Sequence, residues 1–241
     1  LSVNRALTLS GPNATANPNT GVRGLEAVLD GTGLGAGNAI TVAANNVTIQ
    51  GLEIANRAGS AISCIGVAGV GYWTNLHIEN NYIHDVTANA LHIYRTYGGV
   101  AIIDNRINHV NGPYGSDGSG IYYYYDSDPY NYGNVISGNV IADTSYGGIL
   151  LNGTKATIAN NTIGTMPQQG IQIAGNSNPV TITGNTITDV NLAESLDKGG
   201  IRIKVPTLTS PIVIENNVIS GSFNGIAVEA SSTGLSNIQV F

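Results

Sequence analysis

The chain has 241 residues, of which 32 are glycine and 29 are asparagine, while 10% are charged and 6% are aromatic. An apolar content of 42% is too high for a disordered chain, and this length can bury a sizeable core. The net charge of -6, the lack of any basic block and the lack of an apolar run of about 18–20 residues exclude a nucleic-acid partner and insertion into a membrane.

The chain opens on a strand-like stretch, SVNRALTLSG at residues 2–11, and a repeat follows it. The repeated unit is a motif of the form apolar-x-x-Asn-x-Ile. Its copies are LHIENNYI (Asn81), AIIDNRI (Asn105), NVISGNVI (Asn139), ATIANNTI (Asn161), VTITGNTI (Asn185) and VIENNVI (Asn217), and an earlier copy, VTIQGLEI, has Leu52 in the Asn position. These landmarks lie 29, 24, 34, 22, 24 and 32 residues apart, so one repeat needs about 22–24 residues and the excess forms loops.

A second apolar motif follows each copy of the first. Its members are SAISCI, NALHIY, SGIYYY, GGILLN, QGIQIA, GGIRIK and NGIAVE. Apolar and polar residues alternate within both motifs, as in Val180, Thr181, Ile182 and Thr183, which is strand and not helix periodicity. Two strands in so short a period leave no room for a helix, and the repeat therefore predicts an all-β parallel solenoid of about nine coils.

The recurring asparagine predicts a stacked column at one bend of each coil. Asparagine tolerates left-handed backbone angles at such a bend, and its side chains can hydrogen-bond from coil to coil. We expect this ladder to contain Asn81, Asn105, Asn139, Asn161, Asn185 and Asn217. The isoleucines two residues further on, from Ile83 to Ile219, should form a buried stack. The lone cysteine, Cys64, lies in an apolar stretch and is expected to be buried.

At this point the sequence resembles the right-handed parallel β-helix superfamily, the pectin-lyase-like proteins and their uncharacterised secreted bacterial relatives. The opening coils, with LTLSGPN, VLDGTG and AITVAANNVTIQGLEI, carry this resemblance together with the repeat. It implies a right-handed, single-stranded parallel β-helix over residues 1–241 and an extracellular or cell-surface location. It does not imply one activity, because the fold hosts lyases, hydrolases, epimerases, adhesins and fibres.

The middle coils carry the candidate binding residues. Aligning the second motifs places an aromatic and charged patch on one outer face, with His92, Tyr94, Tyr122 and Tyr124 at its centre and Arg95 and Asp126 at its edge. Tyrosine rings stack on sugars while the polar groups bond hydroxyls or carboxylates, so the patch favours a polysaccharide ligand. The alternative interpretation is a tyrosine ladder that only stiffens the sheet.

Calcium is the one cofactor that the sequence suggests. Asp117, Asp126 and Asp128 lie in two loops and could supply hard oxygen ligands, although they lack the spacing of a calcium loop. The alternative is that these loop acids are simply solvated.

Evidence for catalysis is weaker, and we assign no catalytic residue. Arg202-Ile203-Lys204 is similar to the Arg-Ile-Lys of polygalacturonases, but no pair of acids lies beside it. Residues 125–130 are similar to the Asp-Pro-His stretch of alginate epimerases, but Tyr130 replaces the histidine. His92, Arg95 and Tyr122 form the best grouping for a polyuronate lyase, which needs a base and a cation.

Both ends read as open coils without a capping helix. The chain is then either a segment of a longer protein or a unit whose end coils pair head to tail with further copies. We therefore expect an extracellular structural or adhesive protein that forms a fibre or surface layer, with polysaccharide binding or a lyase or epimerase activity as the alternative.

Overall fold

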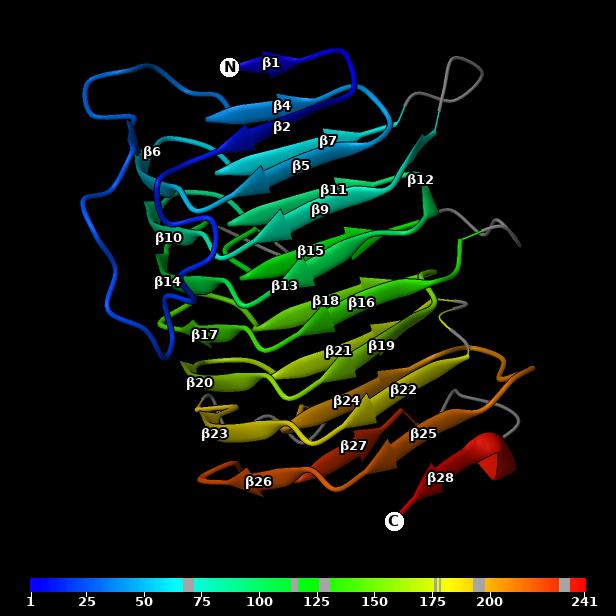
Figure 1. The fold of residues 1–241 in the computed structure, drawn as a ribbon. Coiled ribbons are helices and arrows are strands. Elements are labelled where there is room, and N and C mark those ends of the chain that lie inside the picture. Colours follow the sequence, from blue (N-terminus) through cyan, green and yellow to red (C-terminus); the bar gives the residue numbers. More distant parts are fainter. Residues whose placement is uncertain are drawn as a thin grey trace.

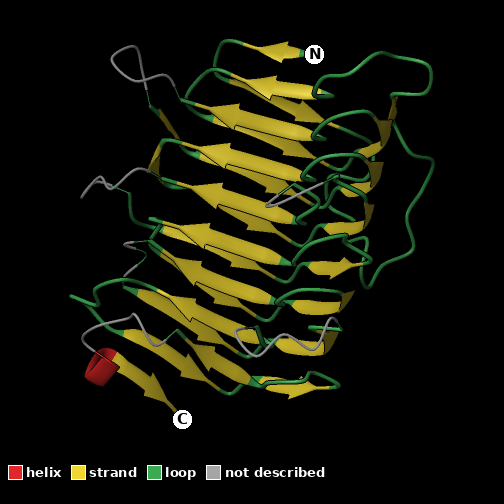
Figure 2. Ribbon diagram, turned by 180° about the vertical axis from the view of Figure 1, so that it is seen from behind, coloured by secondary structure: helices red, strands yellow, loops and turns green. Residues whose placement is uncertain are grey.

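The computed structural model describes residues 1–66, 72–113, 117–125, 131–175, 177, 179–192, 198–229 and 235–241. The chain winds into stacked coils whose strands form three long sheets, with the two termini at opposite ends of the stack (Figure 1). The view from behind shows the same parallel layering (Figure 2). The strands pair in parallel and in register, which confirms the predicted parallel β-helix of about nine coils.

Each sheet takes one strand from successive coils. Sheet 1 contains, in pairing order, β1 (Ser2–Val3), β4 (Ile40–Val42), β7 (Ile62–Ile65), β11 (Leu91–Tyr94), β15 (Ile121–Tyr124), β18 (Ile149–Asn152), β21 (Ile171–Ala174), β24 (Ile201–Lys204) and β27 (Ile226–Val228). Sheet 2 contains β2 (Leu7–Ser10), β5 (Val47–Gln50), β9 (Leu76–Glu79), β13 (Ala101–Ile103), β16 (Asn134–Ser137), β19 (Ala156–Ala159), β22 (Val180–Thr183), β25 (Ile212–Glu215) and β28 (Ile238–Val240).

Sheet 3 completes the coil. It contains β3 (Val28–Asp30), β6 (Glu53–Arg57), β10 (Tyr82–Val86), β14 (Arg106–Val110), β17 (Val140–Ala142), β20 (Thr162–Met166), β23 (Thr186–Val190) and β26 (Val218–Ser220). Two further strands, β8 (Trp73–Thr74) and β12 (Thr96–Gly98), pair at one corner, and a 3-10 helix, η1 (Leu235–Asn237), precedes β28. Among the described residues, no helix has the length and hydropathy needed to cross a bilayer.

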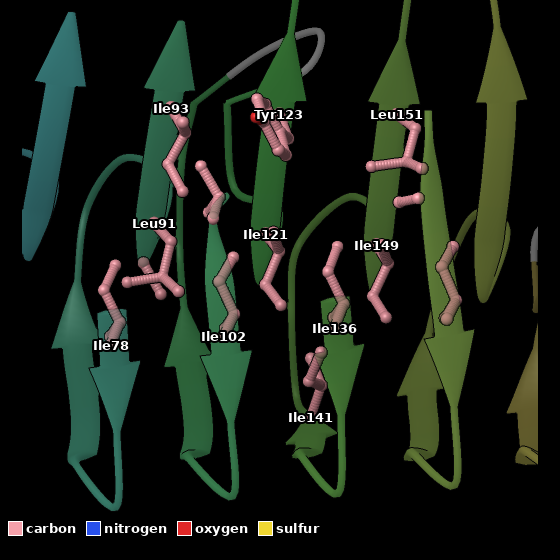
Figure 3. Close-up of a cluster of buried hydrophobic side chains, with 14 of the residues drawn as sticks. Ile78, Leu91, Ile93, Ile102, Ile121, Tyr123, Ile136, Ile141, Ile149 and Leu151 are labelled. Carbon is pink, nitrogen blue, oxygen red and sulfur yellow. The ribbon is translucent and has the colours of Figure 1, made fainter. Parts of the chain in front are cut away.

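The core fills the space that the three sheets enclose. Inward positions alternate with outward ones along each strand, so that Leu91 and Ile93 of β11 point inside together with Ile121 and Tyr123 of β15 (Figure 3). These four side chains are fully buried. The alternation seen in the sequence is thus the physical cause of a continuous apolar core.

An asparagine ladder lines the bend between sheets 2 and 3. The Oδ1 atom of each ladder residue accepts hydrogen bonds of 2.9 to 3.0 Å from the backbone N–H and the Nδ2 group of the ladder residue before it. The participants are Asn81, Asn105, Asn139, Asn161, Asn185 and Asn217. Leu52 begins the column, because its backbone N–H also donates to Asn81, at 3.1 Å.

The left-handed backbone angles at this bend lie one residue before the ladder, which corrects the expectation from the sequence. At this bend, the residues with positive φ values are Gly51, Asn80, Asp104, Gly138, Asn160, Gly184 and Asn216. The residue before the ladder makes the sharp turn, and the ladder asparagine keeps an ordinary conformation. Its side chain is therefore free to point into the bend, where it satisfies buried backbone groups.

A column of small residues explains the glycine that opens the second motif. A Cβ on Gly148 would lie 2.6 Å from Cγ2 of Ile163, and one on Gly170 would lie 2.6 Å from Cγ2 of Ile187. Sheet 3 isoleucines therefore pack directly against the backbone that enters sheet 1.

A strap of residues 11–27 crosses the outside of the bend and is visible in blue beside β6, β10 and β14 (Figure 1). Arg23 Nη1 donates to the carbonyl oxygen of Asn80 at 2.7 Å. Asn19 Nδ2 donates to the carbonyl oxygens of Asn105 and Gly138, at 3.3 and 3.1 Å. The strap thus ties the first coil to coils much later in the sequence.

Candidate functional site

The candidate site is the outer face of β11 and β15. Their register pairs His92 with Tyr122 and Tyr94 with Tyr124, because outward positions of adjacent parallel strands lie side by side. The two strands therefore bring together the four aromatic residues that the sequence placed on this face. All four are half-buried.

The four rings are stacked. The ring centroids of His92 and Tyr122 are 5.5 Å apart at an interplanar angle of 26°, and those of Tyr94 and Tyr124 are 5.0 Å apart at 20°. Arg95 extends the stack, since its guanidinium carbon lies 4.6 Å from the centroid of the Tyr94 ring. Much of each ring face is thus used by a neighbouring ring, so a ligand would meet the ring edges more than the ring faces.

His92 is the most distinctive group on this face. Burial lowers the pKa of its imidazole below the ordinary value of 6.5, and the charge of Asp117 offsets this only in part. The imidazole is therefore neutral at neutral pH and can act as a hydrogen-bond donor and acceptor. Asp117 itself is held by Asn89, whose Nδ2 donates to its Oδ1 at 3.4 Å.

Residues that the sequence did not single out also belong to this region. Ser63 of β7 pairs with His92, and its buried hydroxyl has no hydrogen-bond partner in the described structure. Tyr72 packs on Tyr97 and Tyr125, with ring centroids 4.6 and 6.1 Å away. Tyr72 and Tyr97 lie outside the repeated motifs, so no periodicity in the sequence could have placed them here.

The described structure does not contain the calcium site that the sequence suggested, because two of its three predicted ligands lie outside the described residues. Asp126 and Asp128 lie outside the described residues, which also removes Asp126 from the described part of the aromatic patch. Asp117 lies near His92 and Asn89. Within the described ranges, no group of three or more His, Cys, Asp or Glu side chains has the arrangement needed to hold a metal ion.

The Arg-Ile-Lys stretch on β24 forms an internal ion pair. Arg202 is only 5% exposed and donates to Gln172 at 2.9 Å and to Glu229. Lys204 Nζ lies 3.5 Å from the same glutamate oxygen. A buried arginine that already binds a carboxylate of its own chain is poorly placed to bind a substrate, so this stretch is better explained as a structural contact.

Two further histidines lie on sheet 3. His84 is 2.6 Å from Asp85 and 3.2 Å from Glu53, and His109 is 3.1 Å from Asp143. With His109 Nδ1 also 3.9 Å from Asp85, these contacts join four successive coils, from β6 to β17. They form a polar chain along the outer surface and do not converge on a common point.

Comparison with known families fits this geometry. A family model described as the right handed beta helix region matches residues 89–241, which is more than half of the chain. The chain belongs to the right-handed β-helix family. No match was found among curated proteins. Membership fixes the architecture of this β-helix protein, and its function has to be argued from its surfaces.

Proposed function

We propose that this β-helix protein is an extracellular structural or adhesive rod that associates head to tail with further copies of itself, in a fibre or a surface layer. An extracellular place is supported by the composition, which is rich in Asn and Gly and contains only three lysines. The observation that carries the proposal is that, in the described structure, the strands at the two ends of the stack each have one edge without a partner.

In the described structure, the terminal strands of sheets 1 and 2 pair along one edge only: β1 and β2 at the N-terminal end, and β27 and β28 at the C-terminal end. In the last coil, Ile226, Val228 and Val240 occupy core positions, because they pair with the buried residues Ile201, Ile203 and Ile214. They are nevertheless 37%, 41% and 56% exposed. Stacking a second copy would bury them and pair the strand edges, as every internal coil does.

Sedimentation velocity across a range of concentrations tests this proposal. The wild type should form larger species as concentration rises, whereas Val228→Asp should stay monomeric because it places a charge in the stacking face. Val135→Asp is the matched control, since Val135 is similarly exposed, at 36%, but on the side of the rod. Wild-type protein that is strictly monomeric at every concentration contradicts the proposal.

A second candidate function is polysaccharide binding by the face of β11 and β15. The stacked His92, Tyr122, Tyr94 and Tyr124 rings favour it, together with the Arg95 charge beside them. If this face binds a sugar chain, His92→Ala and Tyr122→Ala should lose most of the affinity while the fold survives. Tyr82→Ala, which removes an outward tyrosine of sheet 3, is the control.

Incubation with polyuronates, with and without calcium, distinguishes a lyase from a binding protein. A lyase produces an unsaturated product with ultraviolet absorbance, and His92→Ala should abolish it. Binding without that product supports a carbohydrate-binding surface. The absence of both binding and product leaves the aromatic stack with its structural role.

A further inference from the structure

A cavity of about 310 Å³ opens beside the first coils, and none of its lining residues belongs to the aromatic face. Its walls include the apolar residues Leu1, Val28, Leu34 and Ala39. Two charged residues, Asp30 and Arg57, also line it. The volume is at the lower end of the range for small-molecule sites, which is the size of a small organic molecule.

The side chain of Arg57 packs so closely against Gly31 and Gly37 that a larger residue at either position would crowd it. Arg57 ends β6, and its side chain runs under the loop that follows β3. A Cβ on Gly31 would lie 2.9 Å from Cδ of Arg57, and one on Gly37 would lie 3.1 Å from Nη2. The loop therefore encloses the arginine closely without covering it with other side chains.

Among the described residues, the guanidinium group of Arg57 has no partner. Its Nε and Nη1 atoms are buried, and the described structure gives the group no hydrogen bond and no ion pair. Burying an unpaired charge costs free energy, and proteins normally avoid it by supplying a counter-charge. This chain has a net charge of -6, so an anion is not attracted by its overall field and must be held locally.

Asp30 does not supply that counter-charge. Its Oδ1 accepts hydrogen bonds from the backbone N–H and Oγ1 of Thr32, at 2.9 and 2.7 Å, and from Nδ2 of Asn56, at 3.1 Å. These bonds hold the pKa of Asp30 below its ordinary value and tie its carboxylate to Thr32 and Asn56 instead of to Arg57. Arg57 therefore receives no counter-charge from Asp30, and Nη2, the guanidinium nitrogen that is not buried, is the atom that an external anion can reach.

We propose that this cavity binds a small organic carboxylate with an apolar body, its carboxylate on Arg57 and its hydrocarbon part against Leu1, Val28 and Leu34. An arginine pairs with a carboxylate through charge-assisted hydrogen bonds, which are the strongest ones available to a side chain. The apolar walls contribute by excluding water from the hydrocarbon part. No residue of the aromatic face takes part.

Isothermal titration calorimetry with three six-carbon probes tests the charge requirement. Hexanoate should bind at least about tenfold more tightly than 1-hexanol or hexylammonium, since only hexanoate can pair with the arginine. Arg57→Gln should weaken hexanoate binding by about tenfold or more and leave hexanol unchanged. Arg5→Gln is the control, because Arg5 is an exposed arginine near the same end, and it should bind hexanoate like the wild type.

A second variant keeps the test decisive if Arg57→Gln fails to fold. Leu34 is 60% exposed, so Leu34→Asp should not disturb the core. It adds a negative charge to the cavity wall, which should weaken hexanoate binding and strengthen hexylammonium binding. Equal affinity for hexanoate and hexanol, tighter binding of hexylammonium by the wild type, or hexanoate affinity that neither variant changes would overturn the proposal.

Discussion

Asn105 holds Asn81 by two hydrogen bonds to a single oxygen. Its Oδ1 accepts from the backbone N–H and from the Nδ2 group of Asn81, both at 3.0 Å, and its own Nδ2 donates to the carbonyl oxygen of Ile78 at 2.8 Å. Each ladder residue thus satisfies backbone groups of the coil before it. Because these groups are buried and cannot form hydrogen bonds with water instead, the ladder should contribute strongly to stability.

Removing one ladder residue tests this contribution. Asn139→Ala leaves the backbone N–H and the side-chain amide of Asn105 without their shared acceptor. The free energy of unfolding should fall by about 1–3 kcal/mol, as measured by chemical denaturation, since the buried backbone N–H of Asn105 is left unsatisfied while its Nδ2 group still donates to Ile78. Asn4→Ala, at an exposed position, should change it by less than about 0.5 kcal/mol. Equal effects of the two substitutions contradict a stabilising ladder.

The glycine column makes a prediction with a control inside the same column. Gly148→Ala should lower the free energy of unfolding by about 1–3 kcal/mol, because its Cβ would lie 2.6 Å from Ile163. Gly225 occupies the equivalent place before β27, and a Cβ there meets nothing within 4 Å. Gly225→Ala should leave the free energy unchanged or raise it by up to about 1 kcal/mol. Denaturant titration of both variants gives the comparison, and a stable Gly148→Ala variant counts against close packing here.

Cys64 should be unreactive in the native protein. The thiol is fully buried, and burial raises its pKa to about 12, so the reactive thiolate is absent at pH 8. Labelling by a thiol reagent should be slow in native buffer and fast in denaturant. While the pH lies below the pKa, the thiolate fraction rises about tenfold for each pH unit, so native labelling should speed up from about pH 8 to about pH 9 and still remain far slower than in denaturant. Rapid labelling of the folded chain would mean that the interior of β7 is accessible.

His92 predicts a pH dependence of stability. Its pKa is lowered by folding, so the unfolded chain binds more protons between that lowered pKa and the ordinary 6.5. The stability contribution of neutral His92 is therefore complete above 6.5 and is lost as the pH falls through this window. The free energy of unfolding should decrease less on acidification in His92→Phe than in the wild type. Identical pH profiles would show that His92 is not buried as described.

The repeat made the fold predictable because equivalent positions in successive coils carry the same types of residue and pack in the same way. Alternation put the inward isoleucines in the core, and the fixed spacing of Asn put the ladder in one column. Strand alignment also placed His92 beside Tyr122 and Tyr94 beside Tyr124, since register in a parallel solenoid follows directly from the repeat.

Features outside the repeat were not predictable in this way. The strap of residues 11–27 has no copy elsewhere in the chain, and its contacts with Asn80 and Gly138 bridge long separations in sequence. The sequence around Arg57 gives no sign of a binding site, because the loop with Gly31 and Gly37 packs against this arginine only in the folded chain. Alternation predicts which side of the sheet a side chain faces but not how exposed it is: Leu150 and Arg202 occupy outward positions of their strands, yet both are buried.

Electron microscopy of the purified chain tests the proposed rod most directly. One copy should be a rod whose coils stack at about 4.8 Å, roughly 40 Å long in total. At high concentration the wild type should form end-to-end chains of such rods, and Val228→Asp should give single rods under the same conditions. Single short rods of wild type at every concentration, or side-by-side aggregates that Val228→Asp does not alter, would contradict head-to-tail association.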